Sequence, residues 1–316
     1  MVILGDIEMQ ANIGVVIVTF NRLEKLKKTL TCFKEQDLSP KYVLVVNNNS
    51  SDGTKDFLET WKKDDNYQFQ KMVIHEKENL GGSGGFHVGL EKAKEMDAEW
   101  IWVSDDDAYP QKNTIKVAND FITNNTNEKL LAICASVLDM DDNIAYGHRK
   151  RVENGLLKIS INTVPAVEYE KEAFKLNAFS YVGAIIKKTA LVKYGTTKSD
   201  YFIWFDDTEH SLRISEHGDI VCVPAIKVNH ENELGGAAYD WREYYGLRNE
   251  MDMYKNHFPK RCYRFKVITR FLKSVYLMFG HDKEYYHLYK KALMDSIRGN
   301  LGKDDKYKPG WKPNIN

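Results

Sequence analysis

The stretch WIWVSDDDAYP, residues 100 to 110, joins an apolar run to three consecutive aspartates. The apolar part is typical of a strand that is buried on both faces of a sheet. Because side chains alternate along a strand, we expect Asp105 and Asp107 to point the same way, with Asp106 opposite or sideways. Two convergent carboxylates form the oxygen site that Mg²⁺ or Mn²⁺ prefers. Acidic triplets are more often solvated turns or helix caps, but the position of this one at a strand end favours a metal site.

Three similar apolar runs precede this one, and a helix-like segment follows each of them. The predicted strands are residues 13–20, 42–47, 71–76 and 98–104, and the predicted helices are residues 22–36, 55–63 and 86–96. Such alternation predicts an α/β fold with a mostly parallel, Rossmann-like sheet and flanking helices. Ligands bind at the carboxyl ends of the strands in such sheets. The polar segments TFNR, NNNSSDGT, NLGGSGG and DDD follow the four strands, so the sequence predicts one site built from four loops.

Beyond residue 110 the pattern is mixed. We expect a strand over 130–139, then a polar hairpin or flap within 140–175, and then a strand followed by a helix within 179–195. Further on we expect a helix that opens at Asp206 and Asp207 and a strand over 220–230. From about residue 240 to near residue 300 we expect helices. These elements predict three parts, which are an N-terminal extension (1–11), an α/β domain (12–240) and a C-terminal helical region (241–316).

The composition is that of an ordinary globular protein. The 316 residues are 43% hydrophobic and 28% charged, which is enough for a substantial core. Basic and acidic residues each number 45, so the net charge of zero gives no argument for nucleic acid as a partner. Four widely spaced cysteines indicate reduced, mostly buried thiols. The start MVILGDIEMQ does not resemble a signal peptide, and no run approaches the roughly 20 apolar residues of a membrane span, so we expect a cytoplasmic protein.

The glycine-rich segment ENLGGSGGFHVGL, residues 78–90, is the second chemical feature. Its glycines let the backbone approach a ligand closely and present N–H groups at a helix start, which suits a phosphate. The alternative is a flexible turn. His87 occupies the place of the third glycine of a GxGxxG motif, and no GKS or GKT follows, so a standard dinucleotide site and a P-loop are both disfavoured.

Two further polar positions are ambiguous when they are taken alone. The segment WFDDTEH, residues 204–210, is either an acidic helix start or a carboxylate base beside aromatic side chains that pack on a ligand. His230 ends a predicted strand, which makes it a candidate third metal ligand, although a lone histidine is more often structural.

Together these residues resemble the family 2 glycosyltransferases, which have the GT-A fold, over roughly residues 12 to 235. The motifs that carry the resemblance are VVIVTFNR, VVNNNSSDGT, the DXD-like DDD and WFDDTEHSLR, with YYGLRNE (244–250) after the core. The last segment is similar to one found in bacterial rhamnosyl- and galactofuranosyltransferases. NLGGSGGF together with DDD and WFDD points more narrowly to galactofuranosyltransferase-like members. Each motif is modest, but five in this order are specific.

The resemblance implies a role for each motif residue. Asp105, Asp107 and His230 would hold Mn²⁺ or Mg²⁺, and Asp106 would face the ribose or the donor sugar. Asp207 would be the catalytic base, while Asp206 and Trp204 would contact sugar or acceptor. The family usually has aspartate where this chain has Asn47, which leaves the choice between uracil and thymine open. The nucleotide and diphosphate would be contacted by Thr19, Phe20, Asn21, Arg22, Asn47, Asn79, Gly81 and Gly82.

The function implied is an inverting, metal-dependent transfer of a sugar onto a glycan or lipid-linked acceptor in bacterial surface polysaccharide synthesis. UDP-galactofuranose is the first choice of donor and dTDP-rhamnose the second. Two alternatives belong to other classes, a sugar-nucleotide nucleotidyltransferase and a non-catalytic nucleotide-sugar-binding module. The loop TFNR lacks the glycines that a nucleotidyltransferase normally carries after its first strand.

The segment 259–281 is strongly basic and contains no acidic residue. Aromatic and aliphatic residues alternate with its cations, which is typical of a helix that lies on an anionic membrane. Because the acceptors of the family that the chain resembles are often lipid-linked, the resemblance favours peripheral contact with the inner face of the cell membrane. The alternative is that the apolar side packs on the catalytic domain or on a second subunit of a homo-oligomer.

Overall fold

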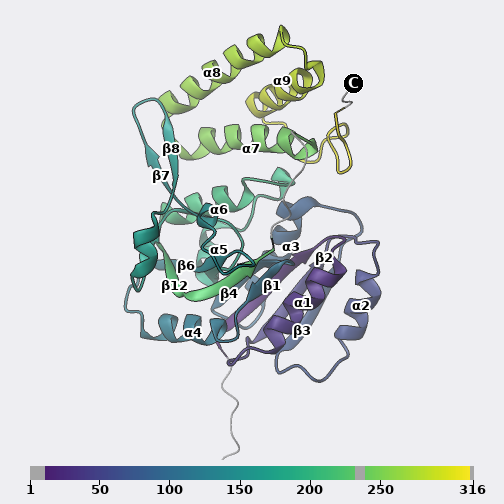
Figure 1. Ribbon diagram of the computed structural model, residues 1–316, viewed down its shortest axis with the longest axis vertical. Helices are drawn as coiled ribbons and strands as arrows, with labels where there is room; N and C mark the ends of the chain where they lie inside the picture. Colours follow the sequence, from purple (N-terminus) through teal and green to yellow (C-terminus); the bar gives the residue numbers. More distant parts are fainter. Residues whose placement is uncertain (1–10, 232–238, 314–316) are drawn as a thin grey trace, which may run out of the picture.

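The computed structural model describes residues 11–231 and 239–313 (Figure 1). The predicted extension, residues 1–11, therefore lies outside the described residues except for Ala11. The first four strands lie side by side in the order β3-β2-β1-β4 and are parallel, as predicted. These strands are β1 (Ile13–Thr19), β2 (Tyr42–Asn47), β3 (Gln70–His75) and β4 (Trp100–Asp105), and the helices between them are α1 (Leu23–Lys34), α2 (Thr54–Trp61) and α3 (Gly81–Glu95).

The second half of the main sheet is mixed rather than parallel. β11 lies between β4 and β6 and is antiparallel to both, whereas β12 runs parallel to β6. The short strands β5 and β9 each pair antiparallel with β12. The elements of this half are β5 (Ala108–Pro110), α4 (Thr114–Asn124), β6 (Leu130–Leu138), β9 (Phe174–Leu176), β11 (Ala184–Lys187), α5 (Lys188–Tyr194), η3 (Ser199–Tyr201), α6 (Asp206–Ser215) and β12 (Asp219–His230).

Both faces of the sheet are buried, which explains the uninterrupted apolar runs. Along β1, Val15 and Ile17 belong to one hydrophobic cluster, and Val16 and Val18 belong to another on the opposite face. All four cysteines are free, and three of them are buried, in agreement with the prediction of mostly buried thiols.

The polar segment after β6 contains the expected hairpin. β7 (Arg149–Asn154) pairs antiparallel with β8 (Ile159–Thr163), and β10 (Ala178–Phe179) adds a third strand to this small sheet. Two short helical turns flank it, η1 (Tyr146–His148) and η2 (Ala166–Glu170). Figure 1 shows the hairpin rising beside the C-terminal helices. Its tip contacts α8 (Lys260–Met278), because the Arg261 Nε donates to the Leu156 carbonyl at 2.8 Å.

Three C-terminal helices stack beyond α6 at one end of the molecule (Figure 1). α7 (Trp241–His257), α8 and α9 (Lys283–Arg298) occupy the segment that was expected to be helical. No helix among residues 11–231 and 239–313 is long and apolar enough to cross a membrane.

Candidate functional site

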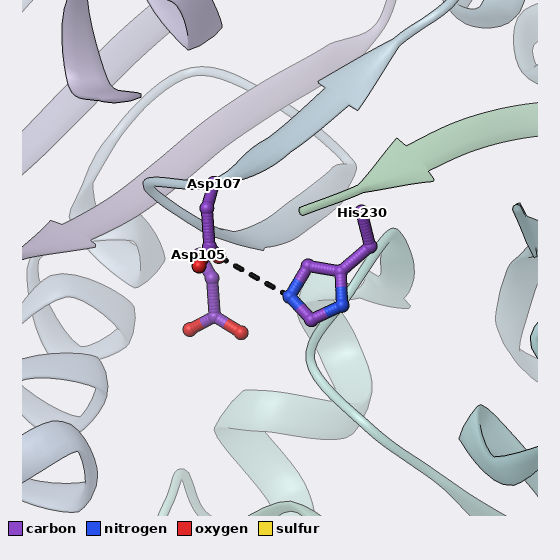
Figure 2. A group of neighbouring side chains, drawn as sticks. All are labelled: Asp105, Asp107 and His230. Atoms are coloured by element: carbon purple, nitrogen blue, oxygen red, sulfur yellow. Dashed lines mark hydrogen bonds and ion pairs between the residues drawn. The ribbon is translucent and has the colours of Figure 1, made fainter. Parts of the chain in front are cut away.

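The predicted metal ligands lie together at the carboxyl edge of the sheet. Asp105 ends β4 and Asp107 follows it, while the pairing of β12 with β5 sets His230 opposite Ala108. One side-chain ligand atom from each of Asp105, Asp107 and His230 lies within 4.8 Å of the others. The His230 Nε2 is 3.2 Å from the Asp107 Oδ1, and Figure 2 shows the three side chains converging.

Burial and like charge make this group of acids unfavourable without a cation. Burial, reinforced by the charge of Asp107, raises the pKa of Asp105 to about 7. Burial also acts to raise the pKa of Asp107, but the hydrogen bond from His230 and the charge of Arg22 hold that pKa below its usual range. The two neighbouring carboxyls therefore differ in protonation near neutral pH.

The residues fit a divalent cation. The Nε2 of His230 faces the two carboxylates and lies 3.2 Å from the Asp107 Oδ1, so it is the ring nitrogen placed to act as a ligand (Figure 2). Two carboxylates and one imidazole are a donor set that suits Mn²⁺ or Mg²⁺. A cation between Asp105 and Asp107 would also offset their mutual repulsion.

Asp106 lies outside this group and connects β4 to β1. Its Oδ2 accepts from the Thr19 hydroxyl at 2.7 Å, and its Oδ1 accepts from Arg22 at 3.3 Å. The residue is only 3% exposed, and burial raises its pKa to about 6 against the opposing charge of Arg22. Arg22 also donates to the Asp107 Oδ2 at 2.8 Å. Thr19, Arg22 and Asp106 therefore brace the acidic loop, and the contact of Asp106 with a donor stays a prediction.

The loops after β1 and β2 are tied to each other. Asn21 accepts from the Ser51 backbone N–H at 2.7 Å, and Phe20 beside it remains 36% exposed. The Asn47 Oδ1 accepts from the Ser50 N–H at 3.0 Å, and its Nδ2 lies 3.0 Å from the His75 Nδ1. The Oδ1 is the acceptor end of the Asn47 amide, because it receives the hydrogen bond of a backbone N–H.

Asn48 is a residue beside the site whose structural role the sequence reasoning missed. Its Nδ2 donates to the Gly81 carbonyl at 2.8 Å and to the Asn79 Oδ1 at 3.1 Å, while its Oδ1 accepts from the Leu80 N–H at 2.9 Å. This buried amide joins the loop after β2 to the glycine-rich segment. Its position in the NNN run was the available signal, but only the fold shows which of the three asparagines makes the connection.

The glycine-rich segment is helical from Gly81, so the prediction that this helix starts at Phe86 was wrong. Glycine is a poor helix former, which explains the error. At Gly81, Gly84 and Gly85 an added Cβ would lie 2.0, 2.5 and 2.6 Å from the Phe202 carbonyl oxygen, Leu80 and Val18 respectively. At Gly82 it would meet nothing within 4 Å. Packing therefore requires the other three glycines, whereas Gly82 leaves open space beside the helix start.

A second acidic pair lies close enough to the first group for the charge of Asp105 to act on it. Asp206 and Asp207 begin α6, and the charge of Asp105 contributes to the pKa of Asp206, which burial and the charge of Asp207 raise to about 8. Burial also raises the pKa of Asp207, although the Thr208 N–H donates to its Oδ1 at 2.5 Å. Burial therefore raises the pKa of both carboxyls, and the charge of Asp207 adds to the shift at Asp206.

Two other side chains complete this part of the site. The cation of Lys150, on β7, opposes the rise that burial causes in the pKa of Asp207. Trp204 is 43% exposed just before α6, where it is available to a ligand. No pattern in the sequence marks Lys150, because its approach to Asp207 depends on where the hairpin lies in the fold.

The comparisons with known proteins agree with this geometry. The sequence profile described as Glycosyl transferase family 2 matches residues 14–183, more than half of the chain. The chain belongs to glycosyl transferase family 2. This family 2 member is a glycosyltransferase, as predicted from its motifs.

Two curated relatives are similar to this family 2 chain at modest identity. Galactofuranosyltransferase GlfT1 of Mycolicibacterium smegmatis is 32% identical over 100 residues, which are 32% of this chain and 31% of GlfT1. dTDP-rhamnosyl transferase RfbF of Shigella flexneri is 27% identical over 311 residues, which are 93% of this chain and 98% of RfbF. The match thus spans less than a third of one relative and almost all of the other.

Solved structures show the fold of this family 2 chain. GalNAc-T7 with UDP, GalNAc and Mn²⁺ superposes with a TM-score of 0.64 at 15% identity, covering 92% of this chain and 56% of that one. S. aureus TarS 1-349 in complex with UDP-GlcNAc gives 0.58 at 16% identity, covering 92% and 81%. The predicted GT-A fold is confirmed.

Proposed function

We propose that the protein is an inverting, metal-dependent glycosyltransferase that moves galactofuranose from UDP-galactofuranose onto a glycan or lipid-linked acceptor in bacterial surface polysaccharide synthesis. The observation that carries the proposal is the Asp105, Asp107 and His230 group with the Asp206 and Asp207 pair close to it. The name of the GlfT1 relative supports galactofuranose, and the UDP-GlcNAc in the TarS complex supports a UDP-linked donor.

The two groups supply the two halves of an inverting displacement. Mn²⁺ or Mg²⁺ held by Asp105, Asp107 and His230 would stabilise the negative charge that develops on the leaving diphosphate. The carboxylate of Asp207 accepts the proton of the acceptor hydroxyl, whose oxygen forms the new bond to the anomeric carbon as the bond to the diphosphate breaks. Asp206 beside it, whose pKa is raised to about 8, adds no second charge at neutral pH. Because attack and departure occur on opposite sides, the anomeric centre inverts.

A dTDP-rhamnose donor is the second candidate, and the near full-length match to RfbF is the observation that favours it. Uracil and thymine share the N3–H that the Asn47 carbonyl can accept, so this contact does not separate the two donors. A thermal-shift panel of nucleotide sugars with Mn²⁺, followed by mass spectrometry of the products on candidate acceptors, distinguishes them. We expect the largest shift with UDP-galactofuranose, and a larger shift with dTDP-rhamnose would reverse the choice.

We also propose that the protein works in the cytoplasm at the inner face of the cell membrane, which α8 contacts. Four large apolar side chains of α8 are 57 to 77% exposed, namely Ile268, Phe271, Leu272 and Tyr276, and Phe279 at its C-cap is 78% exposed. Lys266 and Arg270, which the sequence grouped with the membrane-facing cations, instead pair with Glu250. The exposed cations of the helix are Lys260, Arg261, Arg264 and Lys273. Apolar side chains with cations and without acids suit an anionic lipid surface.

Co-sedimentation with liposomes tests this contact. The protein is expected to sediment with liposomes that contain anionic lipid, and a Phe271→Ser, Leu272→Ser double variant is expected to stay in solution. Val192→Ser on α5 is the matched control, because Val192 is 65% exposed on another helix. Equal sedimentation of both variants, or none by the unchanged protein, would leave the homo-oligomer as the remaining explanation of the apolar face.

A further inference from the structure

The segment that leads into the acidic pair has an unusual backbone. Residues 200–205, called the aromatic segment below, contain Phe202, Trp204 and Phe205 with φ of 67°, 65° and 66°. The other non-glycine residues with positive φ in the described part of the chain are asparagine or aspartate, which tolerate it best. Phe202 is also the centre of a strained γ-turn, with ψ of −56° and a 2.8 Å bond from the Ile203 N–H to the Tyr201 carbonyl. Such a backbone persists only where its surroundings enforce it.

Two buried side chains of α7 hold this backbone conformation through hydrogen bonds. The Asn249 Nδ2 lies 2.9 to 3.0 Å from the carbonyl oxygens of Tyr201, Ile203 and Trp204. The Arg248 Nη2 lies 3.2 and 3.1 Å from the carbonyls of Asp200 and Tyr201, and its Nε donates to the Asn249 Oδ1 at 3.0 Å. Arg248 is 1% exposed and Asn249 is fully buried. The Asn249 Nδ2 and the Arg248 Nη2 are therefore directed at carbonyls of the aromatic segment, while the Arg248 Nη1 donates to the Gly302 carbonyl at 2.6 Å.

Gly246, one turn earlier on α7, sets the position of Trp204. A Cβ added to Gly246 would lie 2.7 Å from the Cε3 of the indole ring. Real Cβ atoms do not approach an aromatic carbon that closely, so the ring lies flush against α7 only because this residue is glycine.

The aromatic segment also contacts the donor side of the site. The Phe202 carbonyl accepts from the Ser83 N–H at 3.1 Å, at the start of α3. At its other end, Phe205 is the residue before Asp206 at the start of α6. The segment thus joins the glycine-rich helix start to the acidic pair, and any shift of it moves both relative to the sheet edge.

We propose that Gly246, Arg248 and Asn249, the α7 clamp, are positioning residues that hold Trp204 and the Asp206–Asp207 pair in place opposite the Asp105, Asp107 and His230 group. This inference rests on the proposed function, because it takes Trp204 and Asp207 as the groups that contact sugar and acceptor. The inference assigns a role to the segment YYGLRNE. Its glycine lets the Trp204 ring lie close to α7, and its arginine and asparagine hold the backbone of the aromatic segment. The C-terminal helical region is then part of the catalytic machinery rather than an appendage.

Ordinary helix packing does not account for these contacts. α7 already packs on α9 through apolar and tyrosine side chains such as Tyr244, Tyr245, Leu288 and Ala292. Stability alone would not need an arginine and an asparagine that bind the carbonyls of a segment with aromatic residues at positive φ. Burying such polar groups is costly unless each is satisfied, and here they satisfy the segment that ends at the acidic pair.

A double-mutant cycle between Gly246→Ala and Trp204→Ala tests the clamp. Alanine suits a helix interior, so Gly246→Ala is expected to stay folded while its methyl group displaces the indole. In the unchanged background it should lower kcat/KM for the acceptor by about 10- to 100-fold, with the Kd for UDP and Mn²⁺ unaltered. In the Trp204→Ala background, where no ring remains to be displaced, Gly246→Ala should have no further effect. An equal loss in both backgrounds, or no loss in either, would overturn the inference.

Hydrogen exchange of the backbone provides a readout without substrate. Asn249→Asp keeps the size of the side chain but removes its N–H donors, so the peptide around residues 199–206 should exchange faster. The matched control is Tyr244→Phe, which removes a buried 2.8 Å hydrogen bond to Asp295 on the α9 side of the same helix. It should leave both the exchange of that peptide and the kinetics unchanged.

The exchange result separates the clamp from the proposed function. Unaltered exchange in both Asn249→Asp and Gly246→Ala would overturn the clamp even if the protein transfers sugar. Faster exchange with no transfer by the unchanged protein would support the clamp as a device that shapes the acidic pair, and would count against the proposed reaction alone.

Discussion

Replacing Gly82 by alanine should change stability and donor affinity in opposite directions. A Cβ at this position meets nothing within 4 Å, and the residue lies in the first turn of α3. Exchange of glycine for alanine in a helix stabilises the folded state by about 0.5–1 kcal/mol. For a domain of this size, that gain corresponds to a rise in Tm of roughly 1–3 °C.

The same methyl group should weaken donor binding, because the open space beside Gly82 is where the diphosphate is proposed to lie. Adding a methyl to a filled site costs about 1–3 kcal/mol, which corresponds to roughly 5- to 150-fold in Kd. Calorimetric titration of UDP with Mn²⁺ and a thermal melt measure the two effects. Lys92→Ala, at the far end of the same helix, is the control and should bind UDP normally. A raised Tm with unaltered affinity would refute the placement of the diphosphate beside Gly82.

Three further predictions follow from the site and its supports. Transfer should stop in EDTA and return when Mn²⁺ is added. The Asp107→Asn variant should need at least tenfold more Mn²⁺ for the same activity, since it lacks one ligand charge. Full activity in EDTA would show that the reaction needs no metal. Gly81→Ala should lower Tm by several degrees in a thermal melt, because its φ is +74° and the added Cβ would lie 2.0 Å from the Phe202 carbonyl oxygen. Burial opposes protonation of His257, but hydrogen bonds to Glu209 and Glu216 raise its pKa. The protonated histidine should therefore stabilise the folded state fully below its unfolded pKa of about 6.5. This stabilisation should be lost as the pH rises through the higher folded pKa. The difference in unfolding free energy between the unchanged protein and His257→Gln, measured by urea denaturation, should therefore shrink with rising pH; a constant difference would contradict it.

The sheet edge was predictable because it depends on local pattern. Each apolar run ends in a polar loop, and parallel strands must bring such loops to one edge. The alternation of side chains along a strand predicted that Asp105 and Asp107 point the same way. The position of His230 at the end of a later strand made it a candidate third ligand. These three side chains come from two distant parts of the chain, yet each carries its own signal in the sequence.

The remaining features could not be predicted, because they arise from tertiary contacts. Helix α3 begins among glycines with Leu80 as its N-cap and no side-chain cap, so neither propensity nor capping marks its start. Asn48 looks like its two neighbours until the glycine-rich helix start is placed against it. The motif YYGLRNE was visible, but the use of its glycine, arginine and asparagine becomes clear only when α7 is seen beside the aromatic segment.

The most direct test of the account is the effect of Asp207→Asn on sugar transfer and on nucleotide binding, measured together. With UDP-galactofuranose, Mn²⁺ and an accepted acceptor, mass spectrometry should show product from the unchanged protein, and NMR should show an inverted anomeric centre. Asp207→Asn should slow transfer by at least about 100-fold, while the Kd for UDP in a calorimetric titration stays within about twofold. Transfer at the original rate, or a loss of UDP affinity that matches the loss of transfer, would contradict the assignment of Asp207 as the base.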